Sequence, residues 1–436
     1  MKVLHLRKAR LSLAVTALLA FSLPCMAEPV PFYRALDLAL EHGGLLVISA
    51  ADQRKARDAY QQARAAYLPT IVFGSGLGYS AGIPPSLAGN APSLFNVASQ
   101  QALLNFAQRD FVRAAKNEMN ATHFDVSDKR NAVLLAAATA YLELDTALRK
   151  LKALSEAAEA AGRAEFITTQ RLKEGLDSQL DLKKAQLGIA RVNVRVAEAQ
   201  ATADVARRHL AQLTGLAAES IETVSESIPS APKISQDEEL PARAAQNNPA
   251  VQLARRKVVT AEFRARGEAR VLYPSIDIAS QYQRLSSTIN NYAQFYKDFK
   301  PNSFAIGLSI RFPITDFAQH AKANAAAADL LRARQEAQMA SDQVAENTLQ
   351  VQRSLRQLAA ASDVARLEYE VAQAGIDAVR AKLASGKADA RDQENARLDS
   401  STRYSSYLDS QLQLTRATMQ LMRQTGDLED WALKKP

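Results

Sequence analysis

Two short motifs in this sequence place acidic side chains a few residues after a glycine. Gly175 precedes the motif SQLD at 178–181, and Gly386 precedes the motif DARD at 389–392. Glycine adopts without strain the left-handed conformation that often ends a helix. A Ser or Asp followed three residues later by an acidic residue is typical of a capping box at the start of a helix. The chemistry predicted here is therefore hydrogen bonding and negative charge at two equivalent helix starts.

Other side chains that could support catalysis do not form a recognisable pattern. The four histidines beyond the N-terminal segment, His42, His123, His209 and His320, lack metal-ligand spacing. No phosphate-binding loop or nucleophile elbow is present. The formal net charge is +8, but the basic residues are interspersed with acidic ones and do not form the basic stripe typical of nucleic-acid binding. We expect no enzyme activity, no cofactor, no metal site and no nucleic-acid partner.

Residues 1–27 have the composition of a secretory signal peptide. A basic start is followed by an apolar segment at 11–23, too short to span a membrane, and then by small residues up to Ala27. We expect cleavage after Ala27. The single cysteine, Cys25, is then a small residue of the cleavage site, although a lipid-bearing cysteine is the alternative. Pro24 disfavours that alternative. The mature chain would hold no disulfide, so packing or assembly must stabilise it.

The remaining sequence contains two copies of one pattern. LLNFAQ at 103–108 matches ITDFAQ at 314–319 at an offset of 211 residues, and the same offset relates Gly175 to Gly386. A constant offset means that the copies differ by no net insertion or deletion. The mature chain is therefore divided into a first structural repeat (28–215), an irregular connector (216–241), a second structural repeat (242–426) and a C-terminal tail (427–436).

Each repeat is predicted to contain a helix, two strands, a very long helix, a turn and a return helix. Proline is absent from 93–228 and from 314–435, and such stretches favour long helices because proline breaks helix interiors. The long helices are expected at 106–173 and 317–383, and at ~1.5 Å per residue each is roughly 100 Å long. Apolar residues at steps of three and four predict coiled-coil-like lateral packing.

Prolines lie at the junctions between the shorter elements. Helices are expected at 33–67 and 248–272, and strands at 70–80, 93–104, 275–285 and 303–312. The junction residues are Pro69, Pro274 and Pro313. In the last strand, apolar side chains alternate with polar or small ones, which indicates one apolar and one polar face.

Four strands of about ten residues have the length that crosses a bilayer as tilted strands. An open sheet cannot lie in hydrocarbon, because the backbone groups at its edges would have no partners. Further copies of the chain must complete it: bacterial barrels begin at about eight strands, and three copies would supply twelve. Aromatic residues flank the strands, as in an interfacial belt: Tyr67, Phe73, Tyr79, Tyr273, Tyr282, Phe304 and Phe312.

In order and spacing, these features resemble the TolC family of bacterial outer-membrane efflux proteins. The resemblance covers essentially the whole mature chain and rests on the duplicated halves and on the prolines at the helix-to-strand exits. Three segments carry it further: FPITDF at 312–317, RLKEGLDSQLDLKKAQ at 171–186 and LASGKADARDQENARLD at 383–399. The fold it implies is mainly α with a small β part: a homotrimer with a 12-stranded barrel in outer-membrane lipid and a periplasmic α-barrel of long antiparallel helices.

The function implied by the resemblance is that of the outer-membrane channel component of a tripartite export system. It would be a passive duct for small molecules or secreted proteins. A periplasmic adaptor, and through it an inner-membrane pump of the RND or ABC type, would be its partners. The alternative is a non-pore periplasmic coiled-coil adaptor or scaffold, but an adaptor would carry a β-rich lipoyl-like domain flanking a single hairpin.

The resemblance also implies roles for residues at the two glycine turns, which would form the periplasmic tip. Expected adaptor contacts are Leu172, Gly175, Leu176, Ser178, Gly386 and Asp389, and expected residues of the tunnel entrance are Asp181, Asp392, Glu394 and Asn395. Asp392 matches an aspartate that rings the entrance in the family, whereas the second such aspartate falls at Asn395, so the negative charge at the entrance is either weaker than in the family or rebuilt from Glu394. For Asp181 helix capping alone is preferred, and for Asp392 capping with or without pore lining stays open. The family's tyrosine and arginine that hold the tip closed fall at Leu383 and Ala388.

Overall fold

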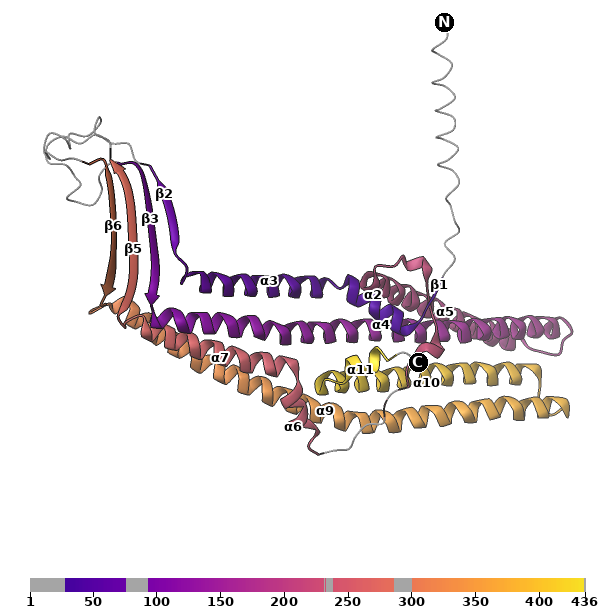
Figure 1. The fold of residues 1–436 in the computed structure, drawn as a ribbon. Helices are drawn as coiled ribbons and strands as arrows, with labels where there is room; N and C mark the ends of the chain where they lie inside the picture. Colours follow the sequence, from indigo (N-terminus) through magenta and orange to yellow (C-terminus); the bar gives the residue numbers. More distant parts are fainter. Residues whose placement is uncertain (1–27, 76–92, 231, 233–237, 286–299, 435–436) are drawn as a thin grey trace, which may run out of the picture.

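The computed structural model describes residues 28–75, 93–230, 232, 238–285 and 300–434. The predicted leader with its cleavage site at Ala27, the end of the first predicted strand and both loops between paired strands lie outside this part. The molecule is elongated, with a sheet at one end and the turns of two long helical hairpins at the other (Figure 1).

The two repeats contain matching elements. The first consists of α2 (Phe32–His42), α3 (Gly44–Ala65), β2 (Thr70–Gly74), β3 (Ser93–Leu104), α4 (Phe106–Lys173) and α5 (Gln179–Thr214). The second consists of α6 (Leu240–Asn247), α7 (Pro249–Arg270), β5 (Ser275–Leu285), β6 (Asn302–Arg311), α9 (Phe317–Ala384) and α10 (Ala390–Thr425). Helices α4 and α9 have 68 residues each, α3 and α7 have 22, and α5 and α10 have 36. The predicted constancy of length is confirmed for these helices.

The predicted helix at 33–67 is wrong in one respect, because it is interrupted at Gly43. Gly43 has an extended backbone between α2 and α3. A side chain there would meet the carbonyl oxygen of Ala39 at 2.8 Å. The glycine therefore permits a close approach of the chain to itself, and α3 leaves in a new direction.

The connector and the tail are more structured than the sequence analysis expects. Within the connector, β4 (Ile221–Thr223) pairs in parallel with β1 (Glu28–Val30). In the tail, α11 (Leu428–Ala432) packs into the largest hydrophobic core, where Leu428 is fully buried. At the centre of this core, the buried Tyr141 hydroxyl donates to the carbonyl of Val30 at 2.8 Å. This core holds both ends of the described chain near the middle of α4.

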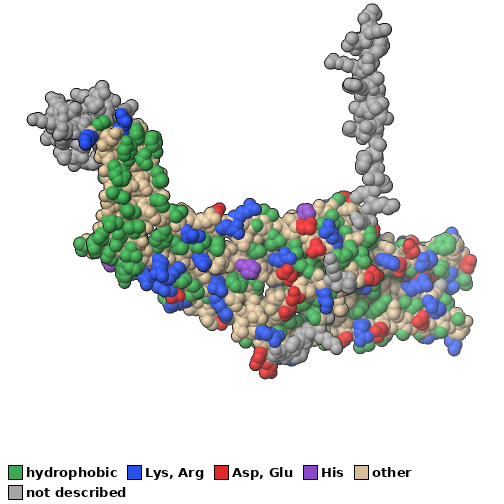
Figure 2. All heavy atoms as spheres, viewed as in Figure 1, with side chains coloured by type: hydrophobic (Ala, Val, Ile, Leu, Met, Phe, Trp, Pro, Cys, Tyr) green, Lys and Arg blue, Asp and Glu red, His purple; other side chains and the backbone are tan. Residues whose placement is uncertain are grey.

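The four longer strands form an antiparallel sheet in the order β2-β3-β5-β6. The register pairs Ile278 with Leu308 and Tyr282 with Phe304, which places apolar side chains on one face. Leu308 and Phe304 are about two-thirds exposed. The other face carries polar and small residues. In the view of Figure 2, hydrophobic side chains cover much of the sheet, whereas charged side chains of both signs are scattered over the helices. The predicted alternation of faces is thus present.

The helices form one layer that continues the sheet. Below the strands the order is α3-α4-α7-α9, and towards the hairpin turns it is α5-α4-α10-α9 (Figure 1). In the described chain, no helix is long and apolar enough to cross a membrane. Like the sheet, the helical layer of the described chain has two open edges, and α9, against which α6 also packs, forms one of them.

The repeated FAQ motif builds the joint between strand and long helix. Asn105 caps α4 by accepting from the backbone N–H of Gln108 at 2.9 Å, and the Gln108 amide donates to Ala63 O, near the end of α3, at 2.7 Å. In the second repeat, Asp316 caps α9 at 2.8 Å and Gln319 donates to Glu268 O of α7 at 2.9 Å. Carbonyls in the last turn of a helix lack partners within it, so the glutamine supplies the missing donor. The motif therefore ties each long helix to the preceding one.

Candidate functional site at the hairpin turns

Both hairpins reverse at a glycine in the left-handed conformation. Gly175 has φ +74° and Gly386 has φ +69°, values that other residues adopt with strain. The helix that follows each turn starts with a complete capping box. Ser178 Oγ accepts from the N–H of Asp181 at 3.2 Å, and Asp181 Oδ2 accepts from the N–H of Ser178 at 3.2 Å. The predicted capping role of Asp181 is confirmed.

The second turn repeats this geometry with an aspartate at the cap. Asp389 Oδ1 accepts from the N–H of Asp392 at 2.8 Å, and Asp392 Oδ2 accepts from the N–H of Asp389 at 3.1 Å. A carboxylate at a helix N-terminus is favoured by the helix dipole as well as by these hydrogen bonds. Each hairpin end is thus a rigid turn, with its acidic side chains held by the following helix.

An arginine that the sequence analysis missed links the two hairpins. Arg391, in the first turn of α10, donates from Nη1 to Asp181 Oδ1 of α5 at 3.1 Å. Its Nη2 lies 3.8 Å from Asp389 Oδ2. A hydrogen bond from the Ser178 hydroxyl, one from the Ser178 N–H and the interaction with Arg391 hold the pKa of Asp181 below its usual value. Asp181 is therefore a capping residue and one half of a cross-hairpin ion pair.

The other candidate residues are distributed unevenly around this pair. Leu176, Gly175, Ser178 and Gly386 are exposed, while Leu172 and Asp389 are partly buried. Asp392 and Asn395 are exposed. Glu394 differs, because it is only 7% exposed and bonds Arg397 at 3.2 Å through Oε1, while its Oε2 has no partner in the described chain. Glu394 therefore does not present a free carboxylate in the single chain.

Away from the turns, the helical layer has a concave face with a volume of about 1110 Å³. It is lined by α3, α4, α7 and α9 and carries six acidic and five basic side chains. The acidic and basic charges nearly balance, so this face favours neither cations nor anions. Among the described residues, no group of three His, Cys, Asp or Glu side chains could hold a metal ion.

Comparisons with known proteins agree with this architecture. A family model described as "Outer membrane efflux protein" matches residues 35–216 and 240–427. Protein CyaE of Bordetella pertussis is 28% identical over 333 residues, which is 72% of this chain and 67% of CyaE. The outer membrane protein VceC of Vibrio cholerae has a similar fold, with a TM-score of 0.74 at 17% identity, over 91% of this chain and 96% of VceC. The Campylobacter jejuni CmeC outer membrane channel matches with a TM-score of 0.74 at 15% identity, over 91% of this chain and 86% of CmeC.

Proposed function

The chain belongs to the outer membrane efflux protein family, and we propose that it works as a homotrimer in which three copies close one continuous export channel. An outer-membrane efflux channel is the function of this family, and its members are channel proteins rather than enzymes. The family match decides against the alternative of a non-pore adaptor or scaffold. It also accounts for the mainly helical fold with a small sheet.

The observation that carries the trimer is the position of the open edges. The sheet ends in β2 on one side and β6 on the other, and the helical layer ends in α3 or α5 on one side and α9 on the other. The unpaired backbone groups of an edge strand cannot remain unpaired in lipid. A second copy that supplies β2 next to β6 also supplies α3 and α5 next to α9. One rotation thus closes both layers, and three copies give twelve strands and twelve helices around the ring.

The apolar sheet face supports a location in the bacterial outer membrane, with the helices in the periplasm. The hairpin turns would then lie farthest from the membrane, where a periplasmic adaptor and an inner-membrane pump of the RND or ABC type would engage them. Exposed Leu176, which is 62% accessible, and the two glycine turns suit such a contact. The channel itself offers a passive path, so the pump would supply the energy and select the substrate.

The cross-hairpin pair supports a gate at the same end. Arg391 holds α5 and α10 together where the tunnel would be narrowest. It lies three residues after Ala388, the position at which the arginine of the family's latch is absent from this chain. Three copies of Asp392 would add negative charge around the entrance. We therefore propose that the Arg391–Asp181 contact stabilises the closed state of the channel and that Asp392 lines the pore.

Conductance of the purified protein in planar bilayers tests this function. We expect discrete channel openings from a trimer that dissociates on heating in detergent. A monomer, or a trimer that inserts without conducting, would contradict the proposal. A variant with Leu308→Asp on the apolar sheet face is a matched test of orientation, because it should abolish insertion, whereas Ser309→Asp on the opposite face should not.

The gate should respond to acid only at low pH. The pKa of Asp181 lies below the ordinary carboxyl value of about 4, so the carboxylate and its pair with Arg391 persist as pH falls from 7 to about 4. Below that, protonation removes the ionic attraction and the conductance should rise. Conductance recorded from pH 7 to pH 3 checks this, and Arg391→Ala should lose most of the acid response. A rise in wild-type conductance between pH 6 and pH 5 would show that a group other than Asp181 controls the gate.

A further inference from the structure

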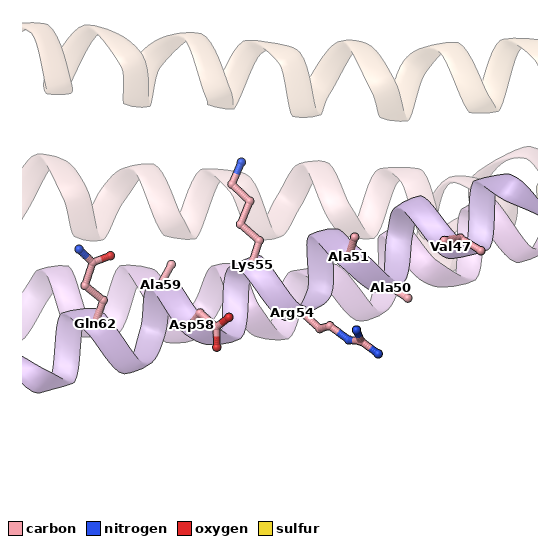
Figure 3. A pocket seen from close by; sticks show the side chains of 8 residues that line it. All are labelled: Val47, Ala50, Ala51, Arg54, Lys55, Asp58, Ala59 and Gln62. Carbon is pink, nitrogen blue, oxygen red and sulfur yellow. The ribbon is translucent and has the colours of Figure 1, made fainter.

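One face of α3 is an exposed groove that, among the described residues, is lined by α3 alone. It runs from Val47 to Gln62, and the side chains that line it recur at steps of three and four residues (Figure 3). Helix α3 packs against α4, but no residue of α4 lines this groove. Alanines at 51 and 59 keep the groove shallow enough for a second helix to approach closely. Rows of side chains at these steps are the ones that interdigitate with the rows of a second helix.

The internal repeat identifies the occupant. Helix α7 is the counterpart of α3 at an offset of 205 residues, and α9 is the counterpart of α4 at an offset of 211. On α7 the equivalent face is filled by α4: the Asn117 side chain donates to Arg256 O at 2.8 Å and to Thr260 Oγ1 at 2.9 Å. Gly267, farther along α7, is covered by the Phe111 ring. In α3 these positions are Ala51, Lys55 and Gln62, all exposed.

We propose that the α3 groove receives α9 of a second copy of this chain, antiparallel and in the register that α4 and α7 adopt within one copy. This rests on the proposed trimer and adds the residues that meet. Gln62 is equivalent to Gly267 and Lys322 is equivalent to Phe111, so Gln62 would lie opposite the partner's Lys322. Three residues farther along, Ala59 lies opposite the partner's Ala325.

Charge complementarity supports this register. Continuing along the antiparallel pair, Lys55 lies opposite the partner's Asp329, and Asp52 lies opposite the partner's Arg332. All four side chains line the same concave face of the helical layer, so they lie on one side of the contact. Two pairs of opposite charge therefore fall on successive turns.

If the partner helix shifts by one turn in either direction, like charges face each other in place of opposite charges. A slip one way places Asp52 opposite the partner's Asp329, and a slip the other way places it opposite the partner's Glu336. Exposed ion pairs contribute little to affinity, but like charges in contact disfavour a wrong alignment. The charges on α3 and α9 thus select the register, while the alanines allow the approach.

Cysteine cross-linking tests the proposal. In a background with Cys25→Ala, the chain holds no other cysteine. Ala59→Cys with Ala325→Cys should convert most of the monomer band into covalent dimers and trimers after mild oxidation. The matched control, Ala59→Cys with Ala318→Cys, uses the same helix face two turns away, ~10 Å along the axis, which a disulfide does not span. It should leave the monomer band unchanged.

The outcomes separate this inference from the trimer itself. If native electrophoresis shows a conducting trimer but the Ala59 and Ala325 pair does not link, or the control pair links equally well, the register is wrong and the channel proposal stands. If the protein is monomeric, both proposals fall. As a second measurement, Lys55→Glu should lower the temperature of trimer dissociation, and Lys55→Glu with Asp329→Lys should restore it. Failure of the double variant to recover would overturn the predicted pair.

Discussion

Replacing Arg391 by alanine should raise the conductance of the channel several-fold. The substitution removes the hydrogen-bonded ion pair of 3.1 Å between α10 and Asp181 of α5 in every copy. In the proposed trimer three copies surround one opening, so three links are lost at once, and the closed arrangement loses the connection between hairpins that lies at the turns, while links farther from the turns, such as Arg195 to Thr402, remain. The capping boxes remain, because Asp181 and Asp389 keep their bonds to backbone N–H groups. The hairpin turns should therefore stay folded while the gate loosens.

Single-channel recording in planar bilayers measures this effect, and a nearby arginine provides the control. Arg380 lies near the end of α9 and pairs with Asp377 of the same helix at 3.2 Å, so Arg380→Ala removes the same charge without breaking a contact between hairpins. Its conductance should equal that of the wild type. Arg391→Lys should give an intermediate value, because a lysine retains the charge but not the forked geometry. Equal conductance in Arg391→Ala and Arg380→Ala would show that the pair does not hold the gate.

The second large effect concerns the joint beneath the sheet. Asp110 in α4 has a fully buried side chain and accepts from Arg270 Nη1 of α7 at 2.7 Å. Asp110→Ala leaves the Arg270 guanidinium without this partner, which typically costs about 3–5 kcal/mol for a buried pair. Because the Arg270 side chain is 36% exposed, we expect the lower end, about 3 kcal/mol. The measurement is the midpoint of unfolding in denaturant.

The internal repeat supplies the control for this prediction. The positions equivalent to Asp110 and Arg270 are Ala321 and Ala65, so the chain itself uses alanine at the matching places. Asp110→Ala with Arg270→Ala should therefore recover most of the lost stability, because the other arginine beside Asp110, Arg113, has a side chain that is 44% exposed and can be hydrated. Asp128→Ala removes a partly exposed pair with Arg423 and should shift the midpoint much less. If the double variant is as unstable as Asp110→Ala, the cost arises from packing and not from the orphaned arginine.

The sequence predicts features that depend on one segment at a time. Helix α4 begins and ends at the expected residues, because proline is absent within it, Asn105 caps its start and Gly175 ends it. The alternation in β6 follows from the pleat of a strand and needs no knowledge of neighbours. The capping boxes at Asp181 and Asp392 are likewise set by local spacing.

Features that depend on contacts between distant segments were missed. Arg391 aligns with Leu180 of the first repeat, so the comparison of copies gives no hint of its pairing with Asp181. That pair forms because the two hairpins lie side by side. The burial of Glu394 and the packing of α11 into the core also depend on tertiary contacts. The break at Gly43 had a local signal, the pair Gly43–Gly44, which was outweighed by the helical pattern on both sides.

The position of α9 at the edge of the helical layer, both below the strands and near the hairpin turns, has a mechanical consequence. This helix is a single rod of 68 residues without proline, and it begins beside the sheet and ends at the hairpin turn. In the proposed ring it would border α3 of the neighbouring copy near the membrane and α5 of the same neighbour near the turn. A force that tilts its lower end must therefore be resisted or transmitted at its upper end. The sheet of one copy would therefore limit how far the hairpin turn of that copy can move against the neighbouring copy.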